Sequence, residues 1–199
     1  MFEQLILEST GDRILVLTEK TWEDYQKISC SNSTNLVSYL NNVITIVSPS
    51  RNHERIATVI TLLVNAYCRK YQIPYFTLGS KDIKKQSVVG KQPDASYCFD
   101  TEKDTPDLAI EVNYTSGSID DLEKYRLLGI KEVWIWQNNA LTFYHKKDDR
   151  YLAKIISQVL YNPNLPLNDA LDSDFLNQYV LRGLSEDNLT IETDFFNNL

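Results

Sequence analysis

Residues 51–71 carry the feature that most constrains the fold, an apolar pattern with the period of an α-helix. Apolar side chains recur there at intervals of three and four residues, so a helix gathers them on one face. The segment Ser48-Pro49-Ser50 ends a strand and provides a helix start. The 199 residues are enough for one domain whose core covers this face. The apolar stripe consists of Ile56, Val59, Ile60, Leu63, Val64 and Tyr67.

Segments with strand character lie on both sides of this helix. The segments 36–40 and 43–47 flank Asn41-Asn42, a pair typical of a tight hairpin turn. The order of elements predicts an α/β fold in a single domain, with a mixed β-sheet flanked by α-helices. Residues 184–199 are expected to form a flexible acidic tail. The other expected strands cover residues 13–17, 75–78, 94–99, 108–113, 132–137, 140–145 and 151–156, and the other expected helices cover 21–28, 118–128 and 173–181.

The composition excludes several classes of protein. Hydrophobic residues make up 43% and charged residues 24% of the chain, which is typical of a folded domain and not of a disordered or fibrous chain. The longest apolar stretch, residues 56–64, is too short to cross a bilayer, so we expect no membrane partner. The three cysteines stand at no metal-ligand spacing and indicate buried thiols of a reducing compartment, so we expect a cytoplasmic protein.

The net charge of −7 disfavours a general nucleic-acid binder, but the charge is unevenly distributed. Residues 148–199 hold nine acidic and three basic residues, whereas residues 81–91 hold four lysines and one aspartate. The lysine-rich segment is either a solvated loop or a surface that meets a polyanion. In the second case nucleic-acid phosphates would be bound by Lys81, Lys84, Lys85 and Lys91.

Acidic residues stand on two of the expected strands. Because side chains alternate along a strand, Glu111 lies on the opposite face from the apolar Ile110 and Val112. A glutamate within a central strand requires a salt bridge, solvent at a sheet edge, or a divalent cation. Asp94 opens another strand, and if the two strands pair, both carboxylates converge on one oxygen-rich site. Mg²⁺ or Mn²⁺ prefers such ligands and can activate water for attack on a phosphodiester.

Four segments, in this order, resemble a known family. They read LNNVITIVSPSRNHE (residues 40–54), GSKDIKKQSVVGKQPDASYCF (79–99), PDLAIEV (106–112) and YRLLGIKEVWIW (125–136). Over residues 21–175 the chain looks like the Uma-two type of restriction endonuclease, within the PD-(D/E)XK nuclease superfamily. The resemblance implies a restriction-endonuclease-like core and Mg²⁺- or Mn²⁺-dependent cleavage of DNA phosphodiester bonds.

The same resemblance implies the site residues. Asp94 matches the aspartate of the Pro-Asp motif and Glu111 the glutamate of the next strand, so the metal ligands would be Asp94, Glu111 and Val112. His53 and Glu54 match a His-Glu pair at the start of the long helix, and Glu54 is the candidate further acid. The helical period points these two side chains in different directions. The alternatives are a histidine that packs at the helix start and a first-turn glutamate favoured by the helix dipole.

The expected catalytic lysine departs from the family pattern. The superfamily motif places it two residues after the glutamate, where this chain has Asn113. Many family members carry it on the next helix, four residues before a tyrosine, where this chain has Asp121 before Tyr125. Lys124 is therefore the candidate to contact the scissile phosphate or the attacking water, and a surface ion pair with Asp121 is the alternative. Gln92 also stands where related sequences often have glutamate.

Three hypotheses follow. The first is a Mg²⁺- or Mn²⁺-dependent endonuclease that acts on DNA, with Asp94, Glu111, Glu54 and Lys124 as catalytic residues. The second is a catalytically degenerate protein that keeps the nuclease fold as a non-catalytic DNA-binding or assembly module. The third is a structural homodimer without a nucleic-acid role. It arises because Trp134 and Trp136 share one strand face, which a helix or a second copy of the chain must cover.

Overall fold

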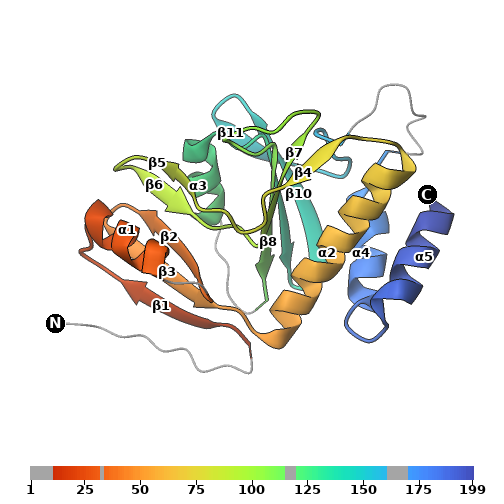
Figure 1. Ribbon diagram of the computed structural model, residues 1–199, viewed down its shortest axis with the longest axis horizontal. Coiled ribbons are helices and arrows are strands. Elements are labelled where there is room, and N and C mark those ends of the chain that lie inside the picture. Colours follow the sequence, from red (N-terminus) through yellow and green to blue (C-terminus); the bar gives the residue numbers. More distant parts are fainter. Residues whose placement is uncertain (1–10, 32–33, 115–119, 161–169) are drawn as a thin grey trace.

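The computed structural model describes residues 11–31, 34–114, 120–160 and 170–199 (Figure 1). In this part of the chain the helices are α1 (Trp22–Ser31), α2 (Arg51–Lys70), α3 (Asp120–Leu128), α4 (Ser173–Arg182) and α5 (Asn188–Asn198). The strands are β1 (Arg13–Leu17), β2 (Leu36–Leu40), β3 (Val43–Ser48), β4 (Tyr75–Thr77), β5 (Ile83–Lys85), β6 (Val89–Lys91), β7 (Ala95–Phe99), β8 (Leu108–Asn113), β9 (Glu132–Gln137), β10 (Ala140–Lys147) and β11 (Arg150–Lys154). The predicted α/β class is confirmed.

The strands form two sheets instead of the one expected. The first sheet has the order β1-β3-β2-β6-β5 and all its pairs are antiparallel. The second has the order β11-β10-β9-β8-β7-β4, and it is mixed because β8 and β9 run parallel. The hairpin turn at Asn41-Asn42 is confirmed, and both residues have the positive φ angles that such a turn requires.

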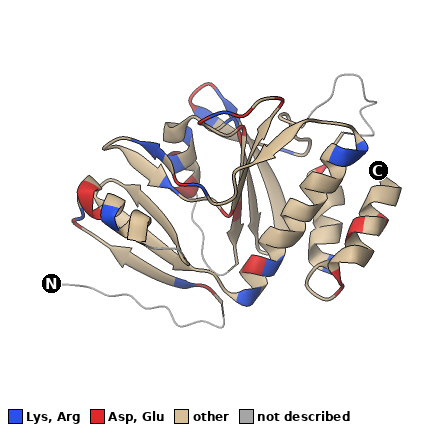
Figure 2. Ribbon diagram, in the orientation of Figure 1, with Lys and Arg blue, Asp and Glu red and all other residues tan. Residues whose placement is uncertain are grey.

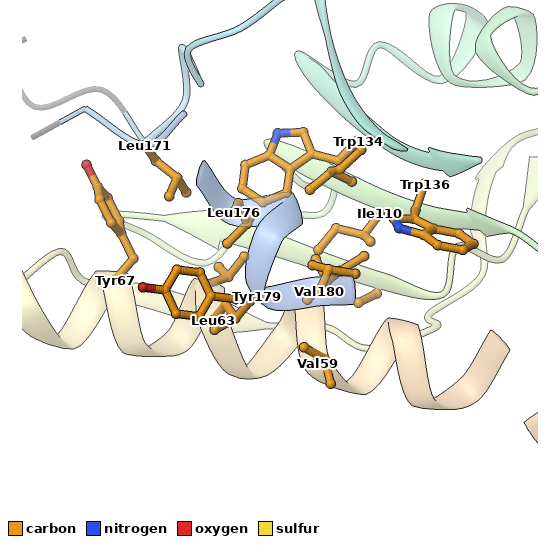
Figure 3. Packing of buried hydrophobic residues seen from close by; sticks show 14 of the residues in the cluster. Val59, Leu63, Tyr67, Ile110, Trp134, Trp136, Leu171, Leu176, Tyr179 and Val180 are labelled. Atoms are coloured by element: carbon orange, nitrogen blue, oxygen red, sulfur yellow. The ribbon is translucent and has the colours of Figure 1, made fainter. Parts of the chain in front are cut away.

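The long helix α2 covers one face of the second sheet, as its apolar stripe predicts. The Ser50 hydroxyl caps its first turn by accepting a hydrogen bond from the His53 amide at 3.3 Å. α4 and α5 lie beside α2 in Figure 1, and these helices and the sheet share one buried cluster. Figure 3 shows Trp134 and Trp136 within this cluster, close to residues of α4. Helices therefore cover the tryptophan face, and homodimerisation stays an untested prediction.

Two smaller clusters occupy the other side of the molecule. α3 and the β5–β6 hairpin pack on the second face of the second sheet, where Tyr125 is fully buried. α1 packs on one face of the first sheet through Trp22 and Tyr25. The opposite face of the first sheet is only partly covered, and it turns toward the end of β8. The two sheets therefore enclose a space between them, which holds the candidate site.

The segment 81–91 is not the solvated loop that we kept as one alternative. It forms the hairpin of β5 and β6, whose β6 strand pairs with β2 and extends the first sheet. The lysine-rich composition suggested a solvated loop, and Lys81, Lys84 and Lys85 are indeed exposed. Lys91 differs from them, since it is only 5% exposed. The hairpin thus carries one inward-pointing lysine into the core of the molecule.

Three further expectations need correction or qualification. Residues 184–199 are not a flexible tail, because α5 buries Ile191 and Phe195 against the cluster around α2. Of the three cysteines, Cys68 and Cys98 are buried, but Cys30 is exposed, and all three are free thiols. The expected helix at 118–128 is seen from Asp120, and residues 118–119 lie outside the described residues. Within the described residues no helix combines the length and apolar character that a bilayer span requires.

Candidate active site between the two sheets

The register of β7 and β8 brings Asp94 and Glu111 together. β7 pairs antiparallel with β8, with Ala95 opposite Ile110, and Asp94 directly precedes the first paired residue of β7. The Asp94 amide donates to the Ile110 carbonyl at 3.0 Å, which extends the ladder to this point. The pairing assumed from the sequence therefore holds, and the two carboxylates flank the same end of the sheet.

Both oxygens of Asp94 accept hydrogen bonds. Oδ2 accepts from the Val112 amide at 2.8 Å, and Oδ1 lies 2.6 Å from Nε2 of His53. The Asp94 side chain is 5% exposed, so these bonds replace most of its contact with water. The carboxylate is consequently fixed in position between β8 and the start of α2.

His53 links Asp94 to a second aspartate. Its Nδ1 lies 2.9 Å from Oδ2 of Asp12, and Oδ1 of Asp12 accepts from the Ser50 amide at 2.8 Å. Ionised carboxylates only accept hydrogen bonds, so the imidazole must donate from both nitrogens and carry a positive charge. Burial alone would lower the pKa of His53, but the bonds and charges of Asp12 and Asp94 outweigh it and raise that pKa to about 10.

Glu111 is held by a lysine and a tyrosine. Its Oε2 accepts from Nζ of Lys91 at 2.9 Å, and its Oε1 accepts from the Tyr125 hydroxyl. The glutamate is 3% exposed. Burial and the nearby charges of Asp94 and Asp121 raise the pKa of Glu111, against the opposing effect of Lys91. Glu111, Lys91 and Asp94 therefore place a desolvated carboxylate beside a fixed cation and a second acid. Such combinations are concentrated in functional sites.

A second ion pair on α3 borders this group. Oδ1 of Asp121 lies 2.9 Å from Nζ of Lys124 and 3.6 Å from Nζ of Lys91. Burial raises the pKa of Asp121, but the two lysines outweigh it and leave that pKa below its ordinary value. Lys124 thus pairs with Asp121, three residues earlier on α3, but this is not the surface pair given as its alternative: the two side chains are 12% and 14% exposed, and both line the cavity described next.

A cavity of about 700 Å³ opens onto these groups. One wall is polar and charged, with His53, Lys91, Glu111, Asn113 and Lys124 among its residues. The other wall is the partly covered face of the first sheet, and its side chains are mostly aliphatic. They include Ile14, Val16, Leu36, Leu40, Val43 and Val47, with Ser38 and Thr45 between them. The site is therefore a charged surface that faces an apolar wall.

Some of the residues expected in the site lie elsewhere. Glu54 is exposed on α2 and is not among the residues that line the cavity, whereas its neighbour His53 is. Lys81, Lys84 and Lys85 are exposed, and Lys84 pairs with Asp82 at 2.9 Å. The two side chains separate as the helical period predicts, with His53 buried on the apolar side of α2 and Glu54 exposed.

Gln92 has a structural position. Its side-chain Oε1 accepts from the Val37 amide at 2.8 Å, and its own amide donates to the Val37 carbonyl at 3.1 Å. Gln92 therefore ties the turn before Asp94 to β2 of the first sheet.

Sequence reasoning missed the roles of Asp12 and Lys91 in this site. Asp12 precedes β1 and has no motif around it, so only the folding of the first sheet reveals its contact with His53. Lys91 was grouped with its exposed neighbours. One signal was available, since Val89-Gly90-Lys91 follows the polar tip of the segment and precedes the Pro-Asp motif.

The oxygen ligands of the site suit a hard divalent cation. Within the described ranges no group of three or more His, Cys, Asp and Glu side chains is arranged to hold a metal ion. A metal here would rely on the carboxylates of Asp94 and Glu111, the Val112 carbonyl and water. Mg²⁺ is commonly bound in this manner, through one or two carboxylates and several waters. Each carboxylate accepts two of its roughly four possible bonds, so capacity for a cation remains.

Comparison with known proteins agrees with this architecture. No curated protein matches the chain. The model of the Uma2 family, described as "Putative restriction endonuclease", matches residues 22–176. The match covers every strand of the two sheets except β1, and it includes Asp94, Glu111 and Lys91. Because it covers most of the sequence, the chain belongs to the Uma2 family and has the restriction-endonuclease-like α/β fold.

Proposed function

We propose that this protein is a Mg²⁺- or Mn²⁺-dependent endonuclease that hydrolyses phosphodiester bonds of DNA. The observation that carries the proposal is the pairing of Asp94 and Glu111 on adjacent strands, at a cavity wall that also holds a buried lysine. Two carboxylates can hold a divalent cation that activates water for phosphodiester hydrolysis, and an ammonium beside them can stabilise the charge that develops on the phosphate. Membership of the Uma2 family supports the same class of reaction.

In this proposal Asp94, Glu111 and the Val112 carbonyl hold the metal. When bound, the metal would activate a water molecule and stabilise the charge that develops on the phosphate. His53 orients Asp94, because it donates to one carboxylate oxygen while the Val112 amide donates to the other. Tyr125 limits the rotation of Glu111 by its bond to Oε1. Glu54 is left out because it is exposed and does not line the cavity.

The charge balance of the site allows an anionic substrate to approach. The carboxylates of Asp12, Asp94, Glu111 and Asp121 face the cations of His53, Lys91 and Lys124, so four negative charges oppose three positive ones. A bound divalent cation would make this sum positive. Phosphate contacts outside the cavity would come from the exposed lysines of the β5–β6 hairpin. Figure 2 shows basic and acidic residues interspersed over the molecule, so local charge and not net charge guides binding.

The test is nicking of supercoiled plasmid in Mg²⁺ and in Mn²⁺, with wild-type protein, Glu111→Gln and Glu102→Gln. Glu102 is an exposed acid between β7 and β8, so its variant controls for the loss of one negative charge. We expect nicking by wild type and Glu102→Gln and none by Glu111→Gln. Equal nicking by all three proteins would place the activity elsewhere or in a contaminant.

A second candidate function is DNA binding without catalysis. The observation that favours it is Asn113, a neutral side chain on the cavity wall at the position where the superfamily motif has lysine. This candidate predicts that wild-type protein binds DNA in a salt-dependent manner, equally with and without metal, and does not nick it. The nicking test and a binding measurement in Ca²⁺ therefore separate the two candidates.

A further inference from the structure

We infer that Lys91, on β6, is the functional lysine of this site: it positions Glu111 and presents its ammonium group to the scissile phosphate. It would do this in place of a lysine at position 113 or 121. The inference rests on the proposed nuclease function and deepens it. It concerns a residue that the sequence analysis names only among the phosphate-contacting lysines, and it depends on the placement of one strand of the first sheet beside the carboxylates of the second.

The contacts of Lys91 carry the first part of the argument. Its Nζ lies 2.9 Å from Oε2 of Glu111 and 5.9 Å from the centre of the Tyr125 ring. The Lys91 side chain is only 7% exposed. Burying an ammonium group is costly unless it is paired, and an uncommitted lysine would extend into water instead. An ammonium has three donors. One is used on Glu111 and a second faces Asp121 at 3.6 Å, so one remains for the cavity that Lys91 lines.

The backbone of Lys91 is held on a rigid element. Lys91 pairs with Ser38 of β2 on one side and with Ile83 of β5 on the other. Because a central strand is restrained by both neighbours, the ammonium group is positioned with little conformational freedom. Positioning of this kind is what a group that acts on a transition state requires.

Lys124, the lysine expected from the sequence, is less well placed. Its Nζ bonds to Asp121, three residues earlier on the same helix, at 2.9 Å. That ion pair has the ordinary spacing of a helical pair, and it directs the ammonium group of Lys124 to Asp121. Between the two lysines, Lys91 is the one whose ammonium group contacts the carboxylate of Glu111.

Asp121 supplies an independent observation. Its carboxylate lies 3.6 Å from Nζ of Lys91, so side chains from β6 and from α3 reach the same point beside Glu111. A lysine at position 121 would therefore bring its ammonium group to the place that Lys91 occupies. In this chain β6 supplies the positive charge, through Lys91, and α3 supplies a negative charge, through Asp121. The two elements that meet at the site therefore carry a lysine and an aspartate that face each other.

The experiment moves the lysine back to the helix. Four proteins are compared: wild type, Lys91→Met, Lys91→Met with Asp121→Lys, and Lys124→Met. Plasmid nicking in Mn²⁺, Mn²⁺ affinity by calorimetry without DNA, and thermal unfolding are measured for each. Methionine keeps the length and packing of the lysine stem but removes its charge.

We expect Lys91→Met to lose about 100-fold or more in nicking rate, the size of effect seen when one stabilising donor is removed from an active site. We also expect Lys91→Met to bind Mn²⁺ more tightly, since a positive charge beside Glu111 is gone. A purely structural role would lower both quantities. The double variant should recover nicking to within about 10-fold of wild type, and Lys124→Met should lose far less than Lys91→Met.

Three results would overturn the inference: Lys91→Met that nicks like wild type, Lys124→Met that loses as much, or a folded double variant that binds Mn²⁺ without regaining activity. If Lys91→Met does not fold, the double variant decides alone, because it keeps one lysine beside Glu111. If wild type does not nick, the proposed function fails, a result distinct from the failure of Lys91 alone.

Discussion

Two buried glutamates stand on neighbouring parallel strands of the second sheet, and their surroundings differ completely. Glu132 opens β9 and is fully buried. It accepts hydrogen bonds from Nε1 of Trp134, Oγ of Ser157 and the Gln158 amide, each at 2.7 Å. Three neutral donors therefore surround one carboxylate, and Nδ1 of His145 lies further away, at 3.5 Å. This glutamate joins β9 to the segment after β11.

Glu111, on β8, has charged neighbours at close range instead. A lysine holds one oxygen, Tyr125 holds the other, and Asp94 and Asp121 are close enough to raise its pKa. A cavity opens beside it, whereas Glu132 is not among the residues of that cavity. The comparison shows that a buried glutamate in a strand does not by itself indicate a site. A site is indicated when the glutamate also has a charged partner, a second acid nearby and a cavity that a ligand can enter.

Glu111→Gln should show most clearly that the two glutamates have different roles. We expect nicking to fall by about 1,000-fold or more, since an amide is a poor metal ligand and the developing charge loses its stabilisation. The free energy of unfolding should fall by only about 1–3 kcal/mol, because the amide oxygen of the variant would still accept a bond from the donors around it. Nicking rates and urea denaturation measure the two effects. A large loss of stability with retained activity would make Glu111 a structural residue like Glu132.

His53→Leu tests the cation that serves Asp94. The substitution leaves Asp12 and Asp94 buried without the imidazolium between them, and breaking such a buried pair costs about 3–5 kcal/mol. We expect both the free energy of unfolding and the nicking rate to fall, since Asp94 loses the group that orients it. The double variant His53→Leu with Asp12→Leu is the control. It removes one unpaired charge and should regain part of the stability without regaining the nicking rate.

Glu132→Gln should act on stability alone. The amide keeps one acceptor oxygen but turns a donor toward groups that are themselves donors, at a cost of about 1–3 kcal/mol. The expected result is a lower urea midpoint with unchanged nicking per folded molecule. A nicking rate that falls as far as in Glu111→Gln would remove the distinction between the two glutamates.

The smallest expected effect concerns Asp107, a carboxylate that is paired with lysines away from the cavity. It bonds to Lys103, to Lys131 at 2.8 Å and to the Phe99 amide at 3.0 Å. Burial raises the pKa of Asp107, but these partners outweigh it and leave that pKa below its ordinary value of 3.8. A carboxyl whose pKa is lower in the folded protein than in the unfolded chain stabilises the folded state at pH values above the unfolded-state pKa. That stabilisation is lost as the pH falls through the folded-state pKa.

The difference in unfolding free energy between wild type and Asp107→Asn should therefore be greatest near neutral pH, at up to about 1 kcal/mol. It should shrink as the pH falls below about 4. Urea denaturation at several pH values measures this difference. A difference that grows toward low pH would contradict the pairing.

Much of the fold could be predicted from the sequence because its determinants are local. Helical spacing locates α2, and the turn chemistry of Asn41-Asn42 locates the β2–β3 hairpin. Strand alternation separates Glu111 from Ile110 and Val112, as the clusters on the two faces of β8 confirm. The hairpin of β5 and β6 and the helix α5 were missed, since lysines and acids mask short elements whose stability comes from packing.

By itself the sequence determined which residue types could meet at one sheet end: an aspartate after proline, a glutamate between apolar strand residues, and their order along the chain. Only the tertiary structure decided which cations serve them. His53 and Lys91 come from α2 and β6, elements distant in sequence from β8, and their selection depends on how the first sheet packs against the second. The physical reason is that a charge can remain buried only where folding brings an opposite charge to it, and that pairing is a property of three-dimensional contact.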